Sequence, residues 1–252
     1  MIRLPVTVTN LPPQPYVPSA ELGLIDNIRH WWTTHQEEYR TDPSGRGYIR
    51  PVIGSVPLQV GGTLPATFSE MTRNGRTRNP FVNDRQRERY FSVPIEITGE
   101  WLSVVTGFRA EPGNNTLHLC GLWLNEGTLI IRPIISGNAA AGGGISWHDG
   151  TTETVILSGP RPTSDETHFL TLAWNRATGR VKYAIDDATP VVSGTTAAVS
   201  SSGTANLTFG ANPGLDAFVG HALNLGIIDG DALTEPLTRQ RLSQYRIALY
   251  GA

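Results

Sequence analysis

Residues 168–191 read HFLTLAWNRATGRVKYAIDDATPV, and this stretch decides the fold. Leu170, Leu172 and Trp174 alternate with smaller or more polar residues, as in a strand with one face in a core. After the turn NRATG the same period of two returns. Two such runs around a short glycine-containing turn predict a β-hairpin whose opposite face is more polar. The second run alternates Val181, Tyr183 and Ile185.

The chain from Tyr90 onward repeats this pattern. Short runs rich in Val, Ile, Leu and aromatic residues are separated by Gly, Pro and Asn clusters; they are YFSVPIEI, EWLSVVTGFRA, NTLHLCGLWL and TLIIRPII. Their spacing is typical of a β-sandwich. ISWHDGTTETVILSG centres on Asp149-Gly150, which predicts a second hairpin. SGNAAAGGGIS predicts a loop, because consecutive glycines carry a high backbone entropy.

The best helical segment is LTEPLTRQRLSQYRIALYG, at the end of the sequence. Thr234 is a suitable N-cap, and Pro236 lies in the first turn, where its missing N–H costs nothing. Leu242, Tyr245 and Leu249 fall on one helical face. We therefore predict an all-β protein with a short C-terminal helix.

Residues 1–19 are rich in proline, which disfavours a helix and predicts an extended arm. The segment is either a disordered linker or an arm that lies on a neighbouring subunit. In the second interpretation five side chains dock on the partner: Leu4, Val6, Val8, Leu11 and Tyr16.

Residues 69–90 are the most charged stretch and show no apolar helical face. We predict a long surface loop that either is simply solvated or binds an acidic polysaccharide or an acidic protein surface. Its arginines are Arg73, Arg76, Arg78, Arg85, Arg87 and Arg89.

Composition restricts the classes of protein. With 252 residues, the predicted domain over 20–252 can bury a core without disulfides or a metal. The one cysteine, Cys120, lies in the apolar run LHLCGLWL and is expected to be a small buried hydrophobe. A formal charge of −2 and a pI near 6.3 argue against general nucleic-acid binding. We expect no export signal and no membrane insertion, hence a soluble protein made in a reducing cytosol.

The order of these segments resembles the concanavalin A-like lectin/glucanase superfamily, in particular its laminin G-like branch. The likeness rests on HFLTLAWNRATGRVKYAIDD followed by LTFGAN, FVGHALNLGIID and ALTEPLTRQRLSQY, with IRHWWTTHQEEY resembling the first strand. Asp186-Asp187-Ala188 stands where the family usually has Asp-Gly. The resemblance covers about residues 20–252 and implies a jelly-roll β-sandwich.

No catalytic pattern of this superfamily is present. A retaining glycosidase needs two nearby acids, typically in the string Glu-x-Asp-x-x-Glu, and the sequence has none. Glu96 and Glu100 flank a glycine turn and point to no shared strand face. RQRERY at 85–90 has the residue types of a polysaccharide lyase without its spacing, and no Gln-x-His occurs. We therefore predict a non-enzymatic protein.

Two kinds of binding site remain. An exposed tryptophan stacks on sugar rings, so Trp147, His148 and Asp149 at the second hairpin are candidate glycan contacts together with the arginine stretch. Calcium is the one cofactor considered, because acids at strand ends can supply oxygen ligands, although such acids also form turns. The candidate calcium ligands are Asp186, Asp187, Asp229 and Asp231. The other tryptophans, expected in the core, are Trp31, Trp32, Trp101, Trp123 and Trp174.

Lectin-like sandwiches normally act outside the cell, and virion proteins reach that place by lysis rather than export. We therefore predict a phage or phage-like virion protein (head decoration, spike or tail fibre component) that binds host-surface glycans. Its arm would contact other virion proteins, and it would form a homo-oligomer located in the virion. The alternatives are a polysaccharide-active enzyme, either a glycosidase or a lyase, and a plain intracellular interaction module.

Overall fold

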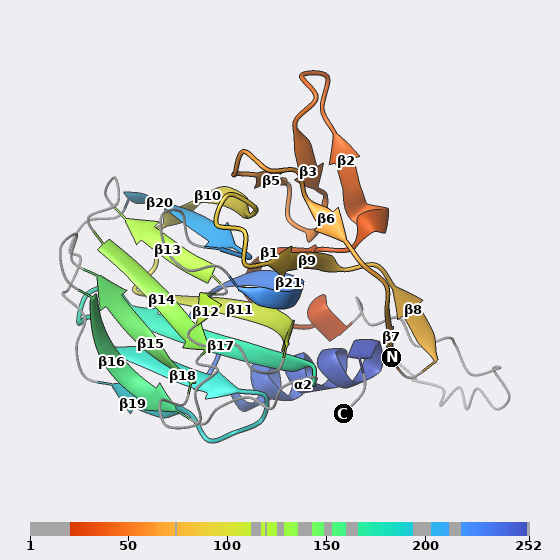
Figure 1. The fold of residues 1–252 in the computed structure, drawn as a ribbon. Helices are drawn as coiled ribbons and strands as arrows, with labels where there is room; N and C mark the ends of the chain where they lie inside the picture. Colours follow the sequence, from red (N-terminus) through yellow and green to blue (C-terminus); the bar gives the residue numbers. More distant parts are fainter. Residues whose placement is uncertain are drawn as a thin grey trace, which may run out of the picture.

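Two large antiparallel β-sheets face each other in the computed structural model (Figure 1). The structure describes residues 21–73, 75–111, 117–118, 120–124, 129–135, 143–148, 153–159, 166–193, 203–211 and 218–250. Within these ranges the first sheet has nine strands and the second has ten. The predicted all-β sandwich is confirmed. The arm predicted at 1–19 lies outside the described residues.

The first sheet is built around its two longest strands. Its order is β19 (Val191–Ser193), β18 (Val181–Ile185), β17 (His168–Asn175), β11 (Trp101–Ala110), β21 (Val219–Asp229), β1 (Ile28–Thr33) and β4 (Pro51–Ile53), with β9 (Phe81–Asp84) pairing β21 and β6 (Thr67–Phe68).

The second sheet contains the second predicted hairpin. Its order is β16 (Glu153–Gly159), β15 (Gly143–His148), β14 (Leu129–Ile135), β13 (Cys120–Leu124), β20 (Gly203–Phe209), β10 (Phe91–Ile97), β5 (Leu58–Val60), β3 (Gly47–Ile49) and β2 (Tyr39–Thr41), with β12 (Leu117–His118) pairing β14. β15 pairs with β16 in antiparallel register, which confirms the second hairpin. Gly143 and Gly144, predicted in a loop, belong to β15.

The core lies between the sheets and follows from the period of two. In β10, buried side chains alternate with partly or fully exposed ones, so the apolar half of the strand faces inward. Side chains from both sheets form one continuous cluster that includes Trp32, Phe91, Leu172, Trp174 and Tyr183. Cys120 is buried there as a free thiol, as predicted, and burial raises its pKa.

The hairpin β17–β18 is confirmed, but its second, more polar face is buried rather than exposed to solvent. All eight residues of β17 are buried. Phe169 packs with residues of the C-terminal helix, and Ala173 packs with Ala184 and Leu233. This face is covered by a segment about 60 residues later in the chain, which contains Leu233 and the C-terminal helix.

The covering element is helix α2 (Pro236–Tyr250), which Figure 1 shows below the first sheet. Leu242 and Tyr245 are buried against this sheet and Leu249 is half-buried, as predicted. Thr234 is not the N-cap, because the helix begins at Pro236. The Thr234 hydroxyl instead donates to Asp231 Oδ2 at 2.7 Å.

The long loop predicted at 69–90 contains strands. β7 (Met71–Arg73) and β8 (Arg76–Arg78) form a separate hairpin, and β9 joins the first sheet. Met71 and Phe81 are buried, and they anchor this charged stretch to the domain. Only about residues 85–90 form a loop. β7 and β8 were missed because they are short and contain arginine, and β9 was missed because it is short and ends in polar residues.

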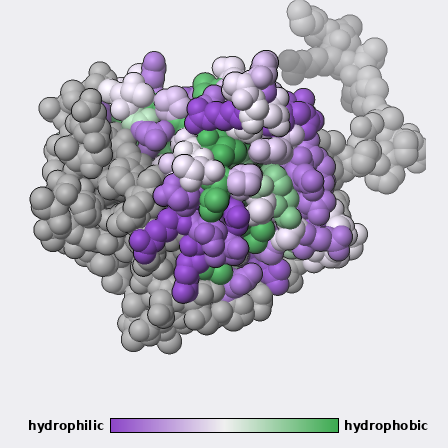
Figure 2. Space-filling view, turned by 45° about the horizontal axis from the view of Figure 1, so that its top comes forward, coloured by the Kyte–Doolittle hydropathy of each residue, from purple (hydrophilic) through white to green (hydrophobic). Residues whose placement is uncertain are grey.

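Hydrophilic residues predominate on the face shown in Figure 2, where hydrophobic residues form a narrow band between them. Trp31, Trp32 and Trp174 are absent from the surface, since each is at most 1% exposed. Trp101 is half-buried with the Lys182 ammonium 4.7 Å above its ring. Within the described ranges, no helix has the length and apolarity needed to cross a membrane.

Candidate functional site

A depression of about 410 Å³ lies where the ends of strands from the two sheets approach each other. Strands β1 and β21 contribute from the first sheet, and β10 and β20 contribute from the second. Its lining combines polar and apolar side chains: Arg29, His30, Val56, Pro94, Ile95, Glu96, Thr98, Thr204 and Asp229. Small-molecule sites commonly occupy about 300–1,000 Å³ and mix an apolar wall with a few polar groups. This depression has both properties.

A β-bulge in β1 explains why two consecutive residues, Arg29 and His30, line the same depression. Ile28 pairs with Ile228 and His30 pairs with Ile227, so β1 has one residue more than β21 at this point. Regular alternation would send Arg29 and His30 to opposite faces, whereas a bulge redirects one side chain. The irregular pairing therefore builds the polar side of the depression.

The Arg29 guanidinium connects the two sheets. Its Nε donates to Asp229 Oδ2 at 2.8 Å, and its Nη2 donates to Asp229 Oδ1. Its Nη1 donates to the Glu96 carbonyl oxygen of β10. Paired hydrogen bonds from arginine to a carboxylate are strong and directional. The ion pair fixes both side chains at the rim without neutralising Glu96.

His30 forms the inner wall of the depression. Its ring stacks on Trp32 with ring centroids 5.3 Å apart. Burial, and then the charge of Arg29, lower the pKa of His30, while Asp229 acts in the opposite direction. The neutral imidazole is therefore favoured at pH 7. Its Nδ1 is buried and has no hydrogen-bond partner among the described residues.

The arrangement suits a neutral polyhydroxylated ligand. Arginine N–H groups, threonine hydroxyls and two carboxylates supply both donors and acceptors to hydroxyl groups. Val56, Pro94 and Ile95 supply the apolar side. With Arg29 balanced by Asp229, the carboxylate of Glu96 leaves the lining with a negative charge, which disfavours anions.

The predicted arginine contacts are divided between two structures. Arg73 and Arg76 face each other across the β7–β8 hairpin, and their side chains are outside the described part. Arg78 lies on β8 and is half-buried. Arg85 and Arg87 are exposed after β9, and Arg85 has a left-handed φ of 70°.

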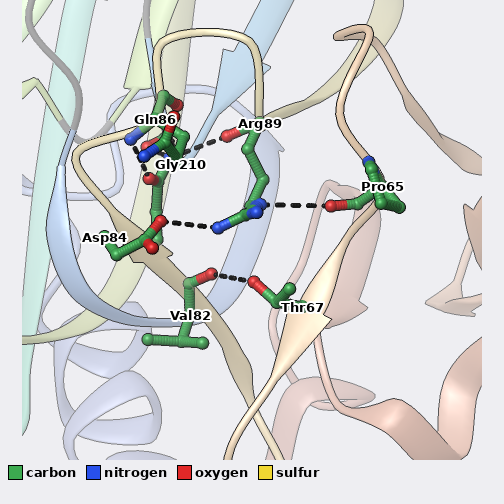
Figure 3. Close-up of polar contacts among 8 residues, drawn as sticks. Pro65, Thr67, Val82, Asp84, Gln86, Arg89 and Gly210 are labelled. Carbon is green, nitrogen blue, oxygen red and sulfur yellow. Dashed lines mark hydrogen bonds and ion pairs between the residues drawn. The ribbon is translucent and has the colours of Figure 1, made fainter.

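Asn83 and Arg89 hold the loop after β9 in place, and Figure 3 shows the contacts of Arg89 with Asp84 and Pro65. Asn83 is fully buried, and its Nδ2 donates to carbonyl oxygens of Gln86, Arg89 and Gly210 at 3.1, 2.7 and 2.9 Å. Its Oδ1 accepts from the Gln86 N–H at 2.8 Å. Arg89 Nε donates to the Pro65 carbonyl at 3.1 Å, and Arg89 pairs with Asp84 at 2.5 Å. Arg85 and Arg87 are thus presented from a fixed loop.

The predicted contacts at the second hairpin are only partly described. Trp147 and His148 lie on β15, where Trp147 pairs with Ile131 and Thr154. Their side chains, and the whole of Asp149, lie outside the described residues.

The four predicted calcium ligands are not assembled into a metal site. Asp229 pairs with Arg29, and Asp231 pairs with Lys182. Across the described ranges no cluster of three or more His, Cys, Asp or Glu side chains could hold a metal ion. The acids are separated because each strand end meets a different basic side chain.

Asp186 and Asp187 attach the hairpin to helix α2. Asp186, with φ of 50°, accepts from the Phe169 N–H at 2.8 Å and lies 2.7 Å from His168 Nδ1. Its Oδ1 is 3.3 Å from Arg246 Nε, and Asp187 Oδ2 accepts from the Ser243 hydroxyl at 2.8 Å. Both acids therefore have a structural role, because their contacts join the hairpin to the helix.

Arg29, His30 and Glu96 were not predicted as site residues. IRHWWT correctly indicated a strand, but nothing local marks the bulge. Its position depends on pairing with residues 227 and 228, about 200 positions later. The sequence offered one signal for this site, the acid Asp229 before a glycine at the end of GIIDG, and Asp229 was interpreted as a possible calcium ligand.

Comparisons with solved structures give the class of fold. The chain is similar to domain 4 of AbnA, an extracellular GH43 arabinanase from Geobacillus stearothermophilus, in complex with arabinotriose. That match has 13% identity, a TM-score of 0.57, and covers 87% of this chain and 99% of the other. It is also similar to Trypanosoma rangeli sialidase, at 11% identity and a TM-score of 0.58 over 87% of this chain and 33% of the sialidase. No family model matches the sequence, and neither does any curated protein.

Proposed function

We propose that this chain is a carbohydrate-binding sandwich of the concanavalin A-like superfamily, carried on a phage or phage-like particle. The observation that carries the binding part is the depression beside Arg29, with sugar-compatible donors, acceptors and an apolar wall in a volume of about 410 Å³. Its charge favours neutral or amino sugars. The arabinanase domain supports this proposal, because a similar fold of the same extent was solved with an oligosaccharide.

The particle part of the proposal rests on the sequence. The proline-rich segment 1–19 suits an arm that docks on a neighbouring virion protein through Leu4, Val6, Val8, Leu11 and Tyr16. Deletion of residues 1–19 is expected to abolish incorporation into particles while glycan binding is retained. Equal incorporation of the truncated protein would contradict the docking role.

Trp147, Arg85 and Arg87 are proposed as additional glycan contacts outside the depression. Arg85 and Arg87 lie on the loop that Asn83 holds in place. Because the loop backbone is already fixed, less conformational entropy is lost when a ligand binds. Trp147→Ala and Arg85→Ala are expected to weaken retention of long polysaccharides more than binding of short oligosaccharides.

The experiment passes the full chain over immobilised host envelope polysaccharide and scores both retention and newly formed sugar ends. Retention of the wild type and its loss in Arg29→Ala support binding at the depression. Arg46→Ala is the matched control, because Arg46 is exposed and donates to the Val60 carbonyl away from the site. Equal retention of both variants would contradict the assignment.

A glycosidase is the second candidate, because two carboxylates, Glu96 and Asp229, line one depression. New reducing ends in the same experiment, abolished by Glu96→Gln, would favour it. Both oxygens of Asp229 are hydrogen-bonded to Arg29, so this carboxylate is better placed to position a ligand than to transfer a proton. Retention without new ends is therefore the expected result.

A further inference from the structure

A second pocket, of about 200 Å³, lies between strand β1, the β7–β8 hairpin and the end of helix α2. It is lined by Thr33, His35, Glu37, Glu38, Val52, Arg78, Tyr245 and Leu249. It shares no residue with the depression beside Arg29. The two lie at opposite ends of β1, so this pocket is a separate feature of the molecule.

Arg78 gives this pocket its charge. The side chain is half-buried, and its Nε is buried without a hydrogen-bond partner among the described residues. Burial lowers the pKa of His35 and raises the pKa values of Tyr245 and Tyr250, and the charge of Arg78 is close enough to act on all three in the lowering direction. An arginine withdrawn from water in this way lacks the hydrogen bonds that a bound carboxylate supplies.

A buried hydrogen-bond network orients the two hydroxyl groups of the pocket. Asn224 Nδ2 donates to Thr33 Oγ1 at 3.2 Å and to Tyr245 Oη at 3.3 Å. Trp31 Nε1 also donates to Tyr245 Oη at 3.2 Å, and Asn224 Oδ1 accepts from Tyr250 Oη at 2.7 Å. Thr33 Oγ1 and Tyr245 Oη also lie 3.5 Å apart, so one hydroxyl donates to the other, and the second keeps a proton that it can donate to a ligand.

Of the other charged groups of the pocket, Glu37 opposes Arg78, but it is exposed and water screens its charge. Glu38 pairs with Arg50 at 3.0 Å. His35 is 5% exposed, and burial followed by the charge of Arg78 lowers its pKa to about 4, so it is neutral at pH 7. Glu37 remains as an acceptor for ligand hydroxyls, and Val52 and Leu249 provide an apolar side. The volume is below the range of about 300–1,000 Å³ usual for drug-sized ligands and suits a single sugar residue.

We propose that this pocket binds a sugar acid, with the carboxylate on Arg78 and the ring hydroxyls on Thr33, Tyr245 and Glu37. A neutral sugar lacks the partner for Arg78, and a simple amino acid lacks the hydroxyls. The pocket thus complements the depression beside Arg29, whose negative lining disfavours anions. This assignment stands whether or not that depression binds carbohydrate.

The test uses the full chain and isothermal titration calorimetry at pH 7 with glucuronate, glucose and glutamate as probes. Glucuronate is expected to bind roughly tenfold or more tightly than the other two, as a charge-assisted pair implies. Arg78→Gln is expected to remove this preference, whereas Arg46→Gln keeps it. Arg78→Lys, which keeps the charge without the planar fork, is expected to retain part of it.

Thermal unfolding of each variant confirms that it is folded before binding is measured. Equal affinity for glucuronate and glucose, or an unchanged preference in folded Arg78→Gln, would overturn the proposal. Glutamate binding as tightly as glucuronate would overturn the assignment to a sugar acid. The variant Arg29→Ala is expected to leave glucuronate binding unchanged, so failure of this proposal is distinct from failure of the proposed function.

Discussion

Arg29 and Asp229 lie 200 positions apart in sequence and form a two-pronged ion pair at the rim of the sandwich. The bulge in β1 supplies the arginine, and the end of β21 supplies the aspartate. The same guanidinium reaches the backbone of β10 in the other sheet. One pair therefore sets the geometry of the depression and fastens the two sheets at this edge.

Gly54 lies directly against this site and is required there. Its φ is 90°, and a Cβ would meet His30 Nδ1 and lie 2.6 Å from the Arg29 carbonyl oxygen. Gly54→Ala is expected to lower the free energy of unfolding by about 2–4 kcal/mol, because left-handed strain and crowding add. The control Gly45→Ala has a φ of 86° with nothing within 4 Å of the added Cβ, and should cost about 1–2 kcal/mol. Urea unfolding measures both; equal losses would contradict the close contact with His30.

Asn83 is predicted to organise the loop that presents Arg85 and Arg87. Asn83→Ala removes the side-chain donor of three carbonyl oxygens and the acceptor of the Gln86 N–H, so a loss of about 1–3 kcal/mol is expected. The Gln86 and Gly210 carbonyl oxygens still accept from the N–H groups of Arg89 and Phe218. Hydrogen exchange of residues 84–90 should accelerate in the variant. The exposed Asn206 gives the control Asn206→Ala, which should change neither quantity. Unchanged exchange in Asn83→Ala would show that the loop is held by other contacts.

Stability should decrease as the pH falls below neutrality, in part through His35. Burial lowers its pKa from 6.5 to about 4, so the fold favours the neutral ring. The contribution is complete above pH 6.5 and is lost as the pH falls from about 6.5 toward 4, by up to about 3 kcal/mol. His35→Gln should flatten urea-unfolding stability over this range. A pH profile identical to that of the wild type would contradict the buried neutral histidine.

The Tyr250 hydroxyl should contribute to the attachment of helix α2. It donates to Asn224 Oδ1 at 2.7 Å in a fully buried position. Tyr250→Phe is expected to cost about 1–3 kcal/mol because the Asn224 oxygen loses its donor. The half-buried Tyr48, on β3, serves as control, and Tyr48→Phe should be nearly neutral. Similar small changes in the melting temperature of both variants would contradict the role of this hydrogen bond.

The elements with local signals could be predicted from sequence. The hairpin β17–β18 has alternation on both arms, and α2 has a proline start and an apolar face. The polar face of that hairpin could not be judged, since its cover comes from Leu233 and α2. β9 was missed because its polar residue Asn83 is buried. The hydrogen bonds that compensate this burial go to the Gln86 and Gly210 carbonyl oxygens, and no local sequence pattern reveals them.

The candidate site depends almost entirely on distant pairing. Arg29 and His30 share one depression only because β21 has one residue fewer opposite them. The acids at 186, 187, 229 and 231 were interpreted as possible metal ligands from their residue type and their place at strand ends. Their partners, Lys182 for Asp231 and Arg246 for Asp186, are set by how the helix and strands pack.

The most direct test of the central claim is the location of a bound oligosaccharide by NMR on the full chain. A short oligosaccharide from a polysaccharide that retains the protein is titrated, and amide shifts are followed. We predict that the shifts gather at Arg29, His30, Glu96 and Asp229 and vanish in Arg29→Ala but not in Arg46→Ala. Shifts that spare these residues, or that persist in Arg29→Ala, would contradict the account.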